Sequence, residues 1–367
     1  MKSVMRNKTY TFTLGLLAVL SLIISGCATS PDVSDGTRAK TYAKRAQAAR
    51  STSPAKHTLA KPEHLPDQVT IPFRTHGEHI FVSTDLNGRD AGLFLLDTGA
   101  AIDAVGMGIA GRLNLPRNGG GTAMGIAGPE KFAFRTVDSV KIGDVDLNRE
   151  KLAAINLNRF NKSMGVTING VIGYSSLKAA PFTLDYPNSQ LVFYHPGEFT
   201  PPNDASRHPL LVRRGLPLVK AEVEDGTTIW LIVDSGADQE LTLPMSYLKR
   251  NPSIVSVPMS GTGQSAGVGG KVKNVRTWLK RMELLGVELK NVPVSFESSP
   301  ALQHSSKIVV GRIGHRLLEN FSLTFDTNSR SIYAKWQPNA RNELAITQAE
   351  QTPNSTIGIR YQPPADN

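Results

Sequence analysis

The sequence predicts a mainly β protein made of two homologous lobes that are related by pseudo-two-fold symmetry. The first observation is a repeated motif: residues 93–100 read LFLLDTGA and residues 231–237 read LIVDSGA, which places Asp97 and Asp234 137 positions apart. The second is that the landmarks around each motif recur in the same order along the chain. The third is that apolar and polar residues alternate in short runs bounded by Gly, Pro, Asn and Asp, which is typical of strands. Together they indicate an internal duplication of a β unit.

The segment before each motif predicts a β-hairpin. Residues 79–97 and 216–234 each contain two alternating runs joined by Asn-Gly or Asp-Gly, the strongest short-range hairpin signal. Short helices are expected after the motifs, at residues 106–115 and 244–251. Each repeat then contains a glycine-rich turn followed by a strand, a turn and another strand.

The end of each repeat also recurs. Residues 169–194 resemble residues 307–335, with Asp185 and Asp326 lying 141 positions apart. In this comparison Val171-Ile172-Gly173 is matched to the triplet Val-Val-Gly at 309–311. A proline-rich stretch at 196–209 is read as the linker between the repeats.

The two ends of the chain are expected to lie outside the repeats. A basic start, an apolar run and small residues form the layout of a secretory signal, and Ile24-Ser25-Gly26-Cys27 resembles a bacterial lipobox, in which the cysteine is lipidated. Cys27 is the single cysteine, so no internal disulfide is expected. The resulting domain prediction is 1–26 lipoprotein signal peptide, 27–67 basic flexible tether, 68–200 first lobe, 201–338 second lobe and 339–367 loose tail.

Charge and composition limit the partners. The formal net charge of the 367 residues is +10 and falls to about +7 without residues 1–26. Part of it lies in the tether, which is expected to be solvated and near anionic lipid or cell-wall polymer. Aromatic and basic residues do not interleave, so no nucleic acid is expected. Ala28 after the lipobox cysteine favours the outer membrane, facing the periplasm of the bacterial cell envelope.

The repeated aspartates suggest paired carboxylate chemistry. A single Asp after a strand is explained equally well by an Asx turn. Two carboxylates about 3 Å apart, however, share one proton and can supply a base and an acid together. A duplication that contributes one Asp from each half would bring such a pair together.

Both repeats resemble the retropepsin-like aspartic proteases. The resemblance rests on DTGA and DSGA, each after an apolar strand and each followed about 75 residues later by two apolar residues and Gly. It implies acid-protease β-barrel lobes with the active site at their interface, no metal and no cofactor. The implied activity is that of an aspartic endopeptidase that acts as a monomer on extended peptide or protein substrates.

The resemblance also assigns roles to single residues. The catalytic dyad would be Asp97 and Asp234. The residues implied to support the dyad are Thr98, Gly99, Ala100, Ser235, Gly236 and Ala237. Those implied to form two mobile flaps over the substrate are Gly125, Ile126, Gly128, Gly267, Val268, Gly269 and Gly270. Alanine at 100 and 237 cannot donate a hydroxyl hydrogen bond to the ionised dyad, so the pH optimum is expected to be mildly acidic to neutral.

The sequence also allows other interpretations. Ser175-Ser176-Leu177-Lys178 fits the S-x-x-K pattern of penicillin-binding enzymes but lacks its companion motifs. His76 and His79 form a close pair, but they lie in a polar turn where solvated histidines are the usual case, and no H-E-x-x-H motif is present, so no metal site is expected. The main alternative is a non-catalytic lipoprotein that uses the same scaffold to bind a peptide or an envelope polymer.

Overall fold

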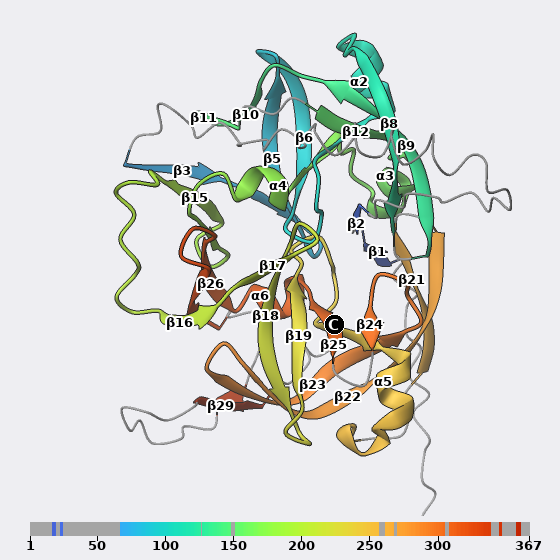
Figure 1. Cartoon of the computed structure of the whole chain (residues 1–367), viewed down its shortest axis with the longest axis vertical. Helices are drawn as coiled ribbons and strands as arrows, with labels where there is room; N and C mark the ends of the chain where they lie inside the picture. Colours follow the sequence, from blue (N-terminus) through green and yellow to red (C-terminus); the bar gives the residue numbers. More distant parts are fainter. Residues whose placement is uncertain are drawn as a thin grey trace, which may run out of the picture.

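The computed structural model describes residues 17–19, 23–24, 67–125, 127–147, 151–256, 261–267, 270–304, 308–338, 345–346 and 357–360. Three β-sheets dominate these residues, and the helices are short (Figure 1). The prediction of a mainly β protein is confirmed.

The first repeat forms an 11-stranded sheet, in the upper part of Figure 1. Its order is β11 (Val145–Asp146), β10 (Val140–Ile142), β5 (His79–Leu86), β6 (Arg89–Asp97), β13 (Gly170–Gly173), β7 (Ala104–Gly106), β12 (Lys151–Ile155), β9 (Pro129–Thr136), β8 (Arg117–Met124) and β2 (Ile23–Ile24), with β4 (Arg74–His76) paired to β5. The helices are α2 (Met107–Arg112), α3 (Asn158–Met164) and α4 (Tyr174–Leu177).

The second repeat forms a 12-stranded sheet, in the lower part of Figure 1. Its order is β1 (Leu17–Val19), β21 (Gly261–Gly267), β22 (Gly270–Leu284), β18 (Leu216–Val223), β19 (Thr228–Val233), β25 (Val309–Ile313), β20 (Leu241–Pro244), β23 (Val287–Glu297), β29 (Ile357–Arg360) and β28 (Ala345–Ile346), with β17 (Leu211–Arg213) paired to β18 and β24 (Gln303–His304) to β25. The helices are α5 (Met245–Arg250), the 3₁₀ helix η1 (Pro252–Ile254) and α6 (His315–Leu318).

A six-stranded sheet combines strands of both repeats. Its order is β16 (Ser206–Pro209), β27 (Ser331–Trp336), β26 (Phe321–Asp326), β14 (Phe182–Asp185), β15 (Gln190–Tyr194) and β3 (Gln68–Pro72). The antiparallel pair β14–β26 joins the two repeats. Phe182 and Phe325 stack across this pair with ring centroids 4.6 Å apart, so the junction is an apolar core.

The two larger sheets pair their strands in the same sense. β6–β13, β13–β7, β7–β12 and β12–β9 are parallel, antiparallel, parallel and antiparallel, as are β19–β25, β25–β20, β20–β23 and β23–β22. β5 and β18 even share one pattern of burial, four buried residues followed by strict alternation. An alternating pattern buries one face of a strand and exposes the other.

The local predictions of turns and helices agree with the structure. β5 and β6 are joined by Asn87 and Gly88, whose φ angles of 53° and 68° are the left-handed values that this turn requires. α2 and α5 lie within the two stretches expected to be helical. In the described part of the chain, no helix is long and apolar enough to cross a membrane.

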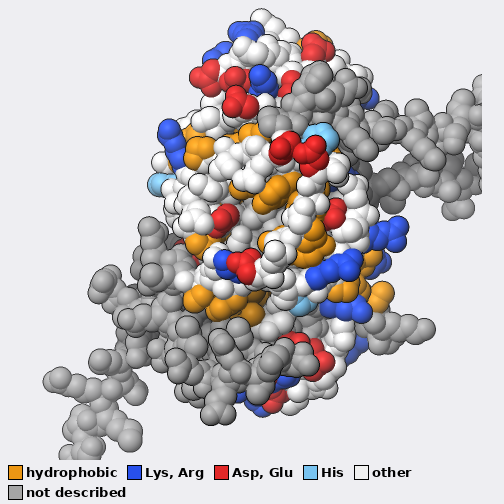
Figure 2. Space-filling view, turned by 90° about the vertical axis from the view of Figure 1, so that its left-hand side faces the viewer, with side chains coloured by type: hydrophobic (Ala, Val, Ile, Leu, Met, Phe, Trp, Pro, Cys, Tyr) orange, Lys and Arg blue, Asp and Glu red, His pale blue; other side chains and the backbone are white. Residues whose placement is uncertain are grey.

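The surface is mixed in character. Figure 2 shows acidic and basic side chains interspersed with apolar ones on one face. Among the described residues the exposed large hydrophobic side chains are those of Met107, Leu211 and Ile308. Cys27 and most of the tether lie outside the described residues.

Candidate active site

The structure brings the two repeated aspartates together. Asp97 ends β6 and Asp234 follows β19, and both are fully buried. A Cβ atom built on Gly99 would lie 2.1 Å from Cγ of Asp234, and one built on Gly236 would lie 2.4 Å from Cγ of Asp97. Glycine is therefore required at both positions, because any side chain would displace the carboxylate contributed by the other repeat.

Thr98 and Ser235 link the two motifs through buried hydrogen bonds. The Thr98 N–H donates to Oγ of Ser235 and the Ser235 N–H donates to Oγ1 of Thr98, each at 3.0 Å. Each hydroxyl also donates across the junction: Thr98 to the carbonyl of Val233 at 2.7 Å, and Ser235 to that of Leu96 at 2.8 Å. All of these groups are buried, so the reciprocal bonds fix the relative position of the motifs.

The carboxylates are oriented by the following glycines. The Gly99 N–H donates to Oδ1 of Asp97 at 2.8 Å, and the Gly236 N–H donates to Oδ1 of Asp234 at 3.1 Å. Burial, and then the charge of Asp234 and a hydrogen bond with it, raise the pKa of Asp97 well above its usual value. One proton is therefore held in the pair at pH values where an exposed Asp would have lost it.

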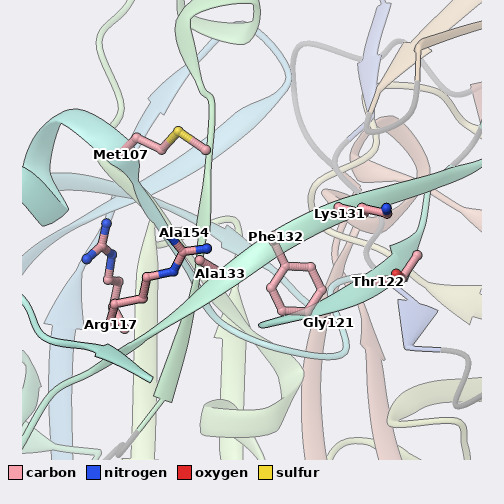
Figure 3. Close-up of a pocket in the computed structure, with 9 residues that line it drawn as sticks. Met107, Arg117, Gly121, Thr122, Lys131, Phe132, Ala133 and Ala154 are labelled. Carbon is pink, nitrogen blue, oxygen red and sulfur yellow. The ribbon is translucent and has the colours of Figure 1, made fainter. Parts of the chain in front are cut away.

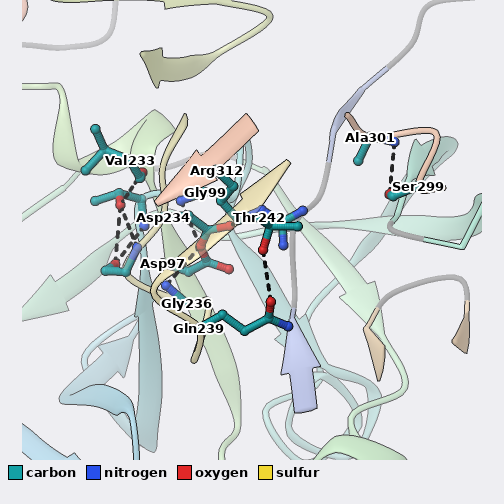
Figure 4. A network of polar contacts seen from close by, with 12 residues as sticks. Asp97, Gly99, Val233, Asp234, Gly236, Gln239, Thr242, Ser299, Ala301 and Arg312 are labelled. Carbon is teal, nitrogen blue, oxygen red and sulfur yellow. Dashed lines mark hydrogen bonds and ion pairs between the residues drawn. The ribbon is translucent and has the colours of Figure 1, made fainter. Parts of the chain in front are cut away.

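Arg312 is a charged neighbour of the dyad, whereas the sequence showed it only as the charged residue that follows the second apolar-Gly triplet. Its Nε lies 3.1 Å from Oδ2 of Asp234, and its side chain is 2 % exposed. Figure 4 shows it beside the aspartates, on the side of Gly99 and Thr242. The Arg312 charge lowers the pKa of Asp97 and so opposes part of the rise caused by burial.

The register of β25 corrects the matching of the two apolar-Gly triplets. Gly173 pairs with Asp97, and the Tyr174 N–H donates to the carbonyl of Ala100 at 2.8 Å. In the second repeat Ile313 pairs with Val233, and the His315 N–H donates to the carbonyl of Ala237 at 2.7 Å. The counterpart of Gly173 is therefore Gly314, three residues beyond the glycine matched from the sequence.

This correction also changes the place of Arg312. In the sequence Arg312 follows Gly311, the glycine of the matched triplet, whereas in the structure it lies within β25, at the position that Val171 occupies in the first repeat. The constant offset of 141 positions between Asp185 and Asp326 would have given the correct register, because it also relates Gly173 to Gly314.

The first glycine-rich turn is the tip of the β8–β9 hairpin. The Gly125 N–H donates to the carbonyl of Gly128 at 2.9 Å, and Gly128 has φ of 144°. Ala127 packs against Ala237, the residue that follows the second motif. Ile126 lies outside the described residues.

The second turn joins β21 and β22. Gly267 pairs with Gly270, whose φ is 123°, while Val268 and Gly269 are outside the described residues. A Cβ on Gly270 would lie 3.5 Å from Cβ of Ala127, so the two turns lie against each other. Both hairpins therefore reach the region above the aspartates.

A separate hollow lies beside the first hairpin (Figure 3). It has a volume of about 660 Å³ and lies between α2 and strands β8, β9 and β12, with Arg117, Lys131 and Arg135 in its wall. Neither aspartate lines it. It is distinct from the site built around Asp97 and Asp234.

Comparison with known families agrees with this geometry. Residues 82–176 match the family model of aspartyl proteases. This stretch is similar to an aspartyl protease domain. It contains Asp97, the β8–β9 hairpin and Gly173, and it confirms the resemblance to retropepsin-like enzymes. No curated protein matches the chain.

Asp238 is a group close to Asp234 that the sequence did not reveal. Burial raises its pKa to about 7, and its Oδ1 is buried without a hydrogen bond. It lies four residues after Asp234, at a position where the first repeat has Ala101. The cue present in the sequence was a third carboxylate close behind the second motif.

The S-x-x-K stretch has a structural role. Ser175 donates to Oδ1 of Asp103 at 3.1 Å, and Ser176 donates to Oδ2 of the same residue. The Gly173 N–H also donates to Asp103, at 2.9 Å. The two serines therefore satisfy a buried carboxylate at the start of α4.

The two histidines are not brought into a metal-binding cluster. The His76 Nε2–H donates to the carbonyl of Met164 at 3.0 Å, and burial lowers the pKa of His79 to about 4. Within the described ranges no group of three or more His, Cys, Asp or Glu side chains is placed to hold a metal ion.

Proposed function

We propose that the protein is an aspartic endopeptidase whose two repeats form acid-protease lobes with one active site between them. The single observation that carries the proposal is the meeting of Asp97 and Asp234, each held by the glycine of its own motif and packed against the glycine of the other. The family match of residues 82–176 supports peptide hydrolysis in general.

The geometry supports a division of labour in the dyad. Asp97, whose pKa is raised by burial and by its neighbour, holds the shared proton, and Asp234 faces Arg312 and carries the negative charge. Asp234 accepts a proton from the attacking water while Asp97 donates its proton to the carbonyl oxygen of the scissile bond. The tetrahedral intermediate then collapses: Asp234 passes the proton that it took from water to the amide nitrogen, the C–N bond breaks, and one hydroxyl of the intermediate returns its proton to Asp97. The products are a carboxylic acid and an amine, and the dyad again holds one proton.

The flap hairpins offer edges to an extended substrate. Within the chain, β1 pairs parallel with β21 at Ser265–Gly267, and β2 pairs antiparallel with β8 at Ala123 and Met124. These pairings support substrate binding by strand addition, in which main-chain hydrogen bonds hold the peptide and pockets select its side chains. The contact between the two turns provides the closure that excludes water.

Localisation and domain organisation are further parts of the proposal. Residues 1–26 act as a signal peptide and Cys27 is lipidated, so that residues 27–67 tether the two lobes, 68–200 and 201–338, to the outer membrane on the periplasmic side. The support is the lipobox-like sequence and the basic composition of the tether. Because one chain supplies both halves of the dyad, the enzyme acts as a monomer.

The second candidate is a non-catalytic peptide-binding lipoprotein. The Arg312–Asp234 ion pair favours it, because it compensates one buried charge and stabilises the site without catalysis. The test is hydrolysis of a peptide library by the purified protein, with a hydroxyl-bearing transition-state mimic as inhibitor and Asp97→Asn as control. Cleavage that the mimic and the substitution both abolish supports the protease; peptide binding without cleavage supports the second candidate.

A further inference from the structure

The two repeats carry opposite chemistry on the faces that flank the dyad. Strand pairing places Val171 beside Ala104 in the first repeat and Arg312 beside Thr242 in the second. The same register makes these positions equivalent. An apolar pair in one half therefore corresponds to a charged and a hydroxyl side chain in the other.

The same contrast is found on the neighbouring strand of each sheet, β12 in the first repeat and β23 in the second. Ala104 pairs with Ala153, whereas Thr242 pairs with Ser295. Two residues further along the same strand face stand Ile155 and Glu297. The set in the first repeat is apolar and lies in one core cluster: Ala104, Phe132, Ala153, Ile155 and Val171. The set in the second repeat is polar and buried: Thr242, Asn274, Ser295, Glu297 and Arg312.

A hydrogen-bond network fixes the polar set. Thr242 donates to Oε1 of Gln239 at 3.0 Å, and Nε2 of Gln239 donates to Oγ of Ser265 at 3.1 Å. Ser265 donates to Oε1 of Glu297, and Nδ2 of Asn274 donates to Ser265 at 2.8 Å. Ser265 lies on β21 and Asn274 on β22, so the network ties the second flap hairpin to the wall of the site.

Apart from Nε of Arg312, which is ion-paired to Asp234, three buried atoms of this set have no hydrogen-bond partner. They are Nη2 of Arg312, Oε2 of Glu297 and Oδ1 of Asn274, and each belongs to a residue that is at most 2 % exposed. A buried donor or acceptor without a partner is destabilising, and such groups in native proteins call for an explanation. A donor and an acceptor left open on one strand face are explained by a ligand that offers both.

The strand register places the open atoms of Arg312 and Glu297 on both sides of Thr242. Arg312, Thr242 and Ser295 are in register on three adjacent strands, and adjacent strands lie about 4.8 Å apart. Arg312 lies on the strand at one side of Thr242, and Glu297 lies on the strand at its other side, two residues beyond Ser295 and in register with Pro244. A planar polar group could lie above Thr242 and reach both.

The charges select the kind of group. An acidic side chain would be repelled by Glu297 and Asp234, and a basic one by Arg312. A carboxamide is neutral and offers one acceptor oxygen and two N–H donors. Its oxygen can accept from Nη2 of Arg312 while its N–H donates to Oε2 of Glu297.

We infer that this polar set lines a substrate subsite that selects a glutamine or asparagine side chain on one side of the scissile bond, whereas the equivalent apolar set of the first repeat lines a subsite for an apolar side chain. The inference rests on the proposed proteolytic function and adds the substrate class. An apolar substrate residue in the polar subsite would leave the open atoms of Arg312 and Glu297 without hydrogen bonds. A site that is built to hydrogen-bond a substrate group strongly rejects substrates that lack this group.

The test uses one peptide series that differs only beside the scissile bond. The residue on one side of the scissile bond is Gln, Asn, Leu, Glu or Lys, while the residue on the other side is kept apolar. The same series is then made for the other side. Both kcat/KM for the wild-type protein and Kd for the inactive Asp97→Asn variant are measured. On one side of the scissile bond, kcat/KM for Gln or Asn peptides is expected to exceed that for Leu peptides by on the order of 10²-fold. On the other side, Leu peptides are expected to have the higher kcat/KM.

Substitution then localises the effect. Glu297→Ile introduces the residue type found at position 155 of the first repeat. This variant is expected to lose the preference for the Gln peptides and to have a higher kcat/KM for the Leu peptides. Thr242→Ala is expected to weaken the preference for the Gln peptides. The matched control is Glu288→Gln on the same strand, whose glutamate is ion-paired to Arg281 at 2.7 Å outside the network. The control should keep the wild-type profile.

The outcomes separate this inference from the proposed function. A wild-type protein that cleaves peptides but prefers Leu, Glu or Lys on both sides overturns the inference alone. If no peptide is cleaved, the proposed function fails, and the Kd series decides the subsite: tighter binding of Gln or Asn peptides supports it, and equal binding overturns it. A Gln preference that survives in Glu297→Ile also overturns the inference.

Discussion

Replacing Arg312 by methionine should move the pH dependence of catalysis. Methionine has a similar length but no charge, so the substitution removes the cation that lies 3.1 Å from Asp234. The Arg312 charge also lowers the pKa of Asp97. Without it, the apparent pKa values of the coupled pair should rise, because the Gly99 hydrogen bond to Asp97 then opposes the effect of burial without the help of a positive charge.

The distance sets the size of the effect. Two unit charges 3.1 Å apart interact by roughly 5 kcal/mol at an effective dielectric constant of about 20. Part of this is offset by the desolvation of the guanidinium, and a neighbouring opposite charge typically lowers a carboxyl pKa by about 1 to 3 units. The acid limb of the profile is therefore expected to move to higher pH by about 1 to 3 units in Arg312→Met.

The assay is kcat/KM against pH for one peptide substrate. The control is Arg316→Met, which removes the same charge from a side chain that is 45 % exposed and ion-paired to Glu78 at 3.3 Å. The control should leave the acid limb in place. An Arg312→Met profile that coincides with the control, or that moves to lower pH, would refute the electrostatic role of Arg312.

Three further predictions concern stability and anchoring. Thr98→Ala should lower the free energy of unfolding in urea by about 2 to 5 kcal/mol, because the buried N–H of Ser235 and carbonyl of Val233 each lose a partner, and a loss as large in Thr98→Ser would contradict this. Asp238 has a pKa of about 7 in the folded state, so it holds its proton where the unfolded chain loses it, and stability should fall as pH rises from about 4 to about 7. Asp238→Asn should remove that fall and gain up to about 4 kcal/mol at neutral pH in thermal unfolding, whereas an unchanged pH slope would exclude Asp238 as its source. Cys27→Ser should release the protein from the membrane or block its maturation, and normal processing with membrane retention in cell fractionation would disprove lipidation.

The sequence predicts those parts of the fold that local patterning determines. Asn87-Gly88 predicts a hairpin because its left-handed backbone is favourable for those residues. Alternation predicts β5 and β18 because one face of each strand is buried. The dyad could be proposed because its motif occurs twice, and a duplicated motif has a geometric consequence that a single copy lacks.

The polar set of the second repeat, which includes Arg312 and Glu297, could not be predicted in the same way. A comparison of the two halves favours Val-Val-Gly at 309–311, because an arginine within a buried strand is rarely stable without a partner. Arg312 is compensated by Asp234, a contact between residues 78 positions apart, from 234 to 312. Glu297 and Gln239 likewise meet only through Ser265 of the flap hairpin. Such clusters depend on tertiary structure and not on local sequence.

The central claim is that Asp97 and Asp234 act as one catalytic unit, and a double-mutant cycle tests it most directly. The measurement is kcat/KM for peptide hydrolysis by the wild type, Asp97→Asn, Asp234→Asn and the double variant. A shared-proton dyad predicts that each single substitution removes as much activity as both together, because neither carboxyl can work alone. Substantial turnover in either single variant, or losses that add in the double variant, would contradict the account.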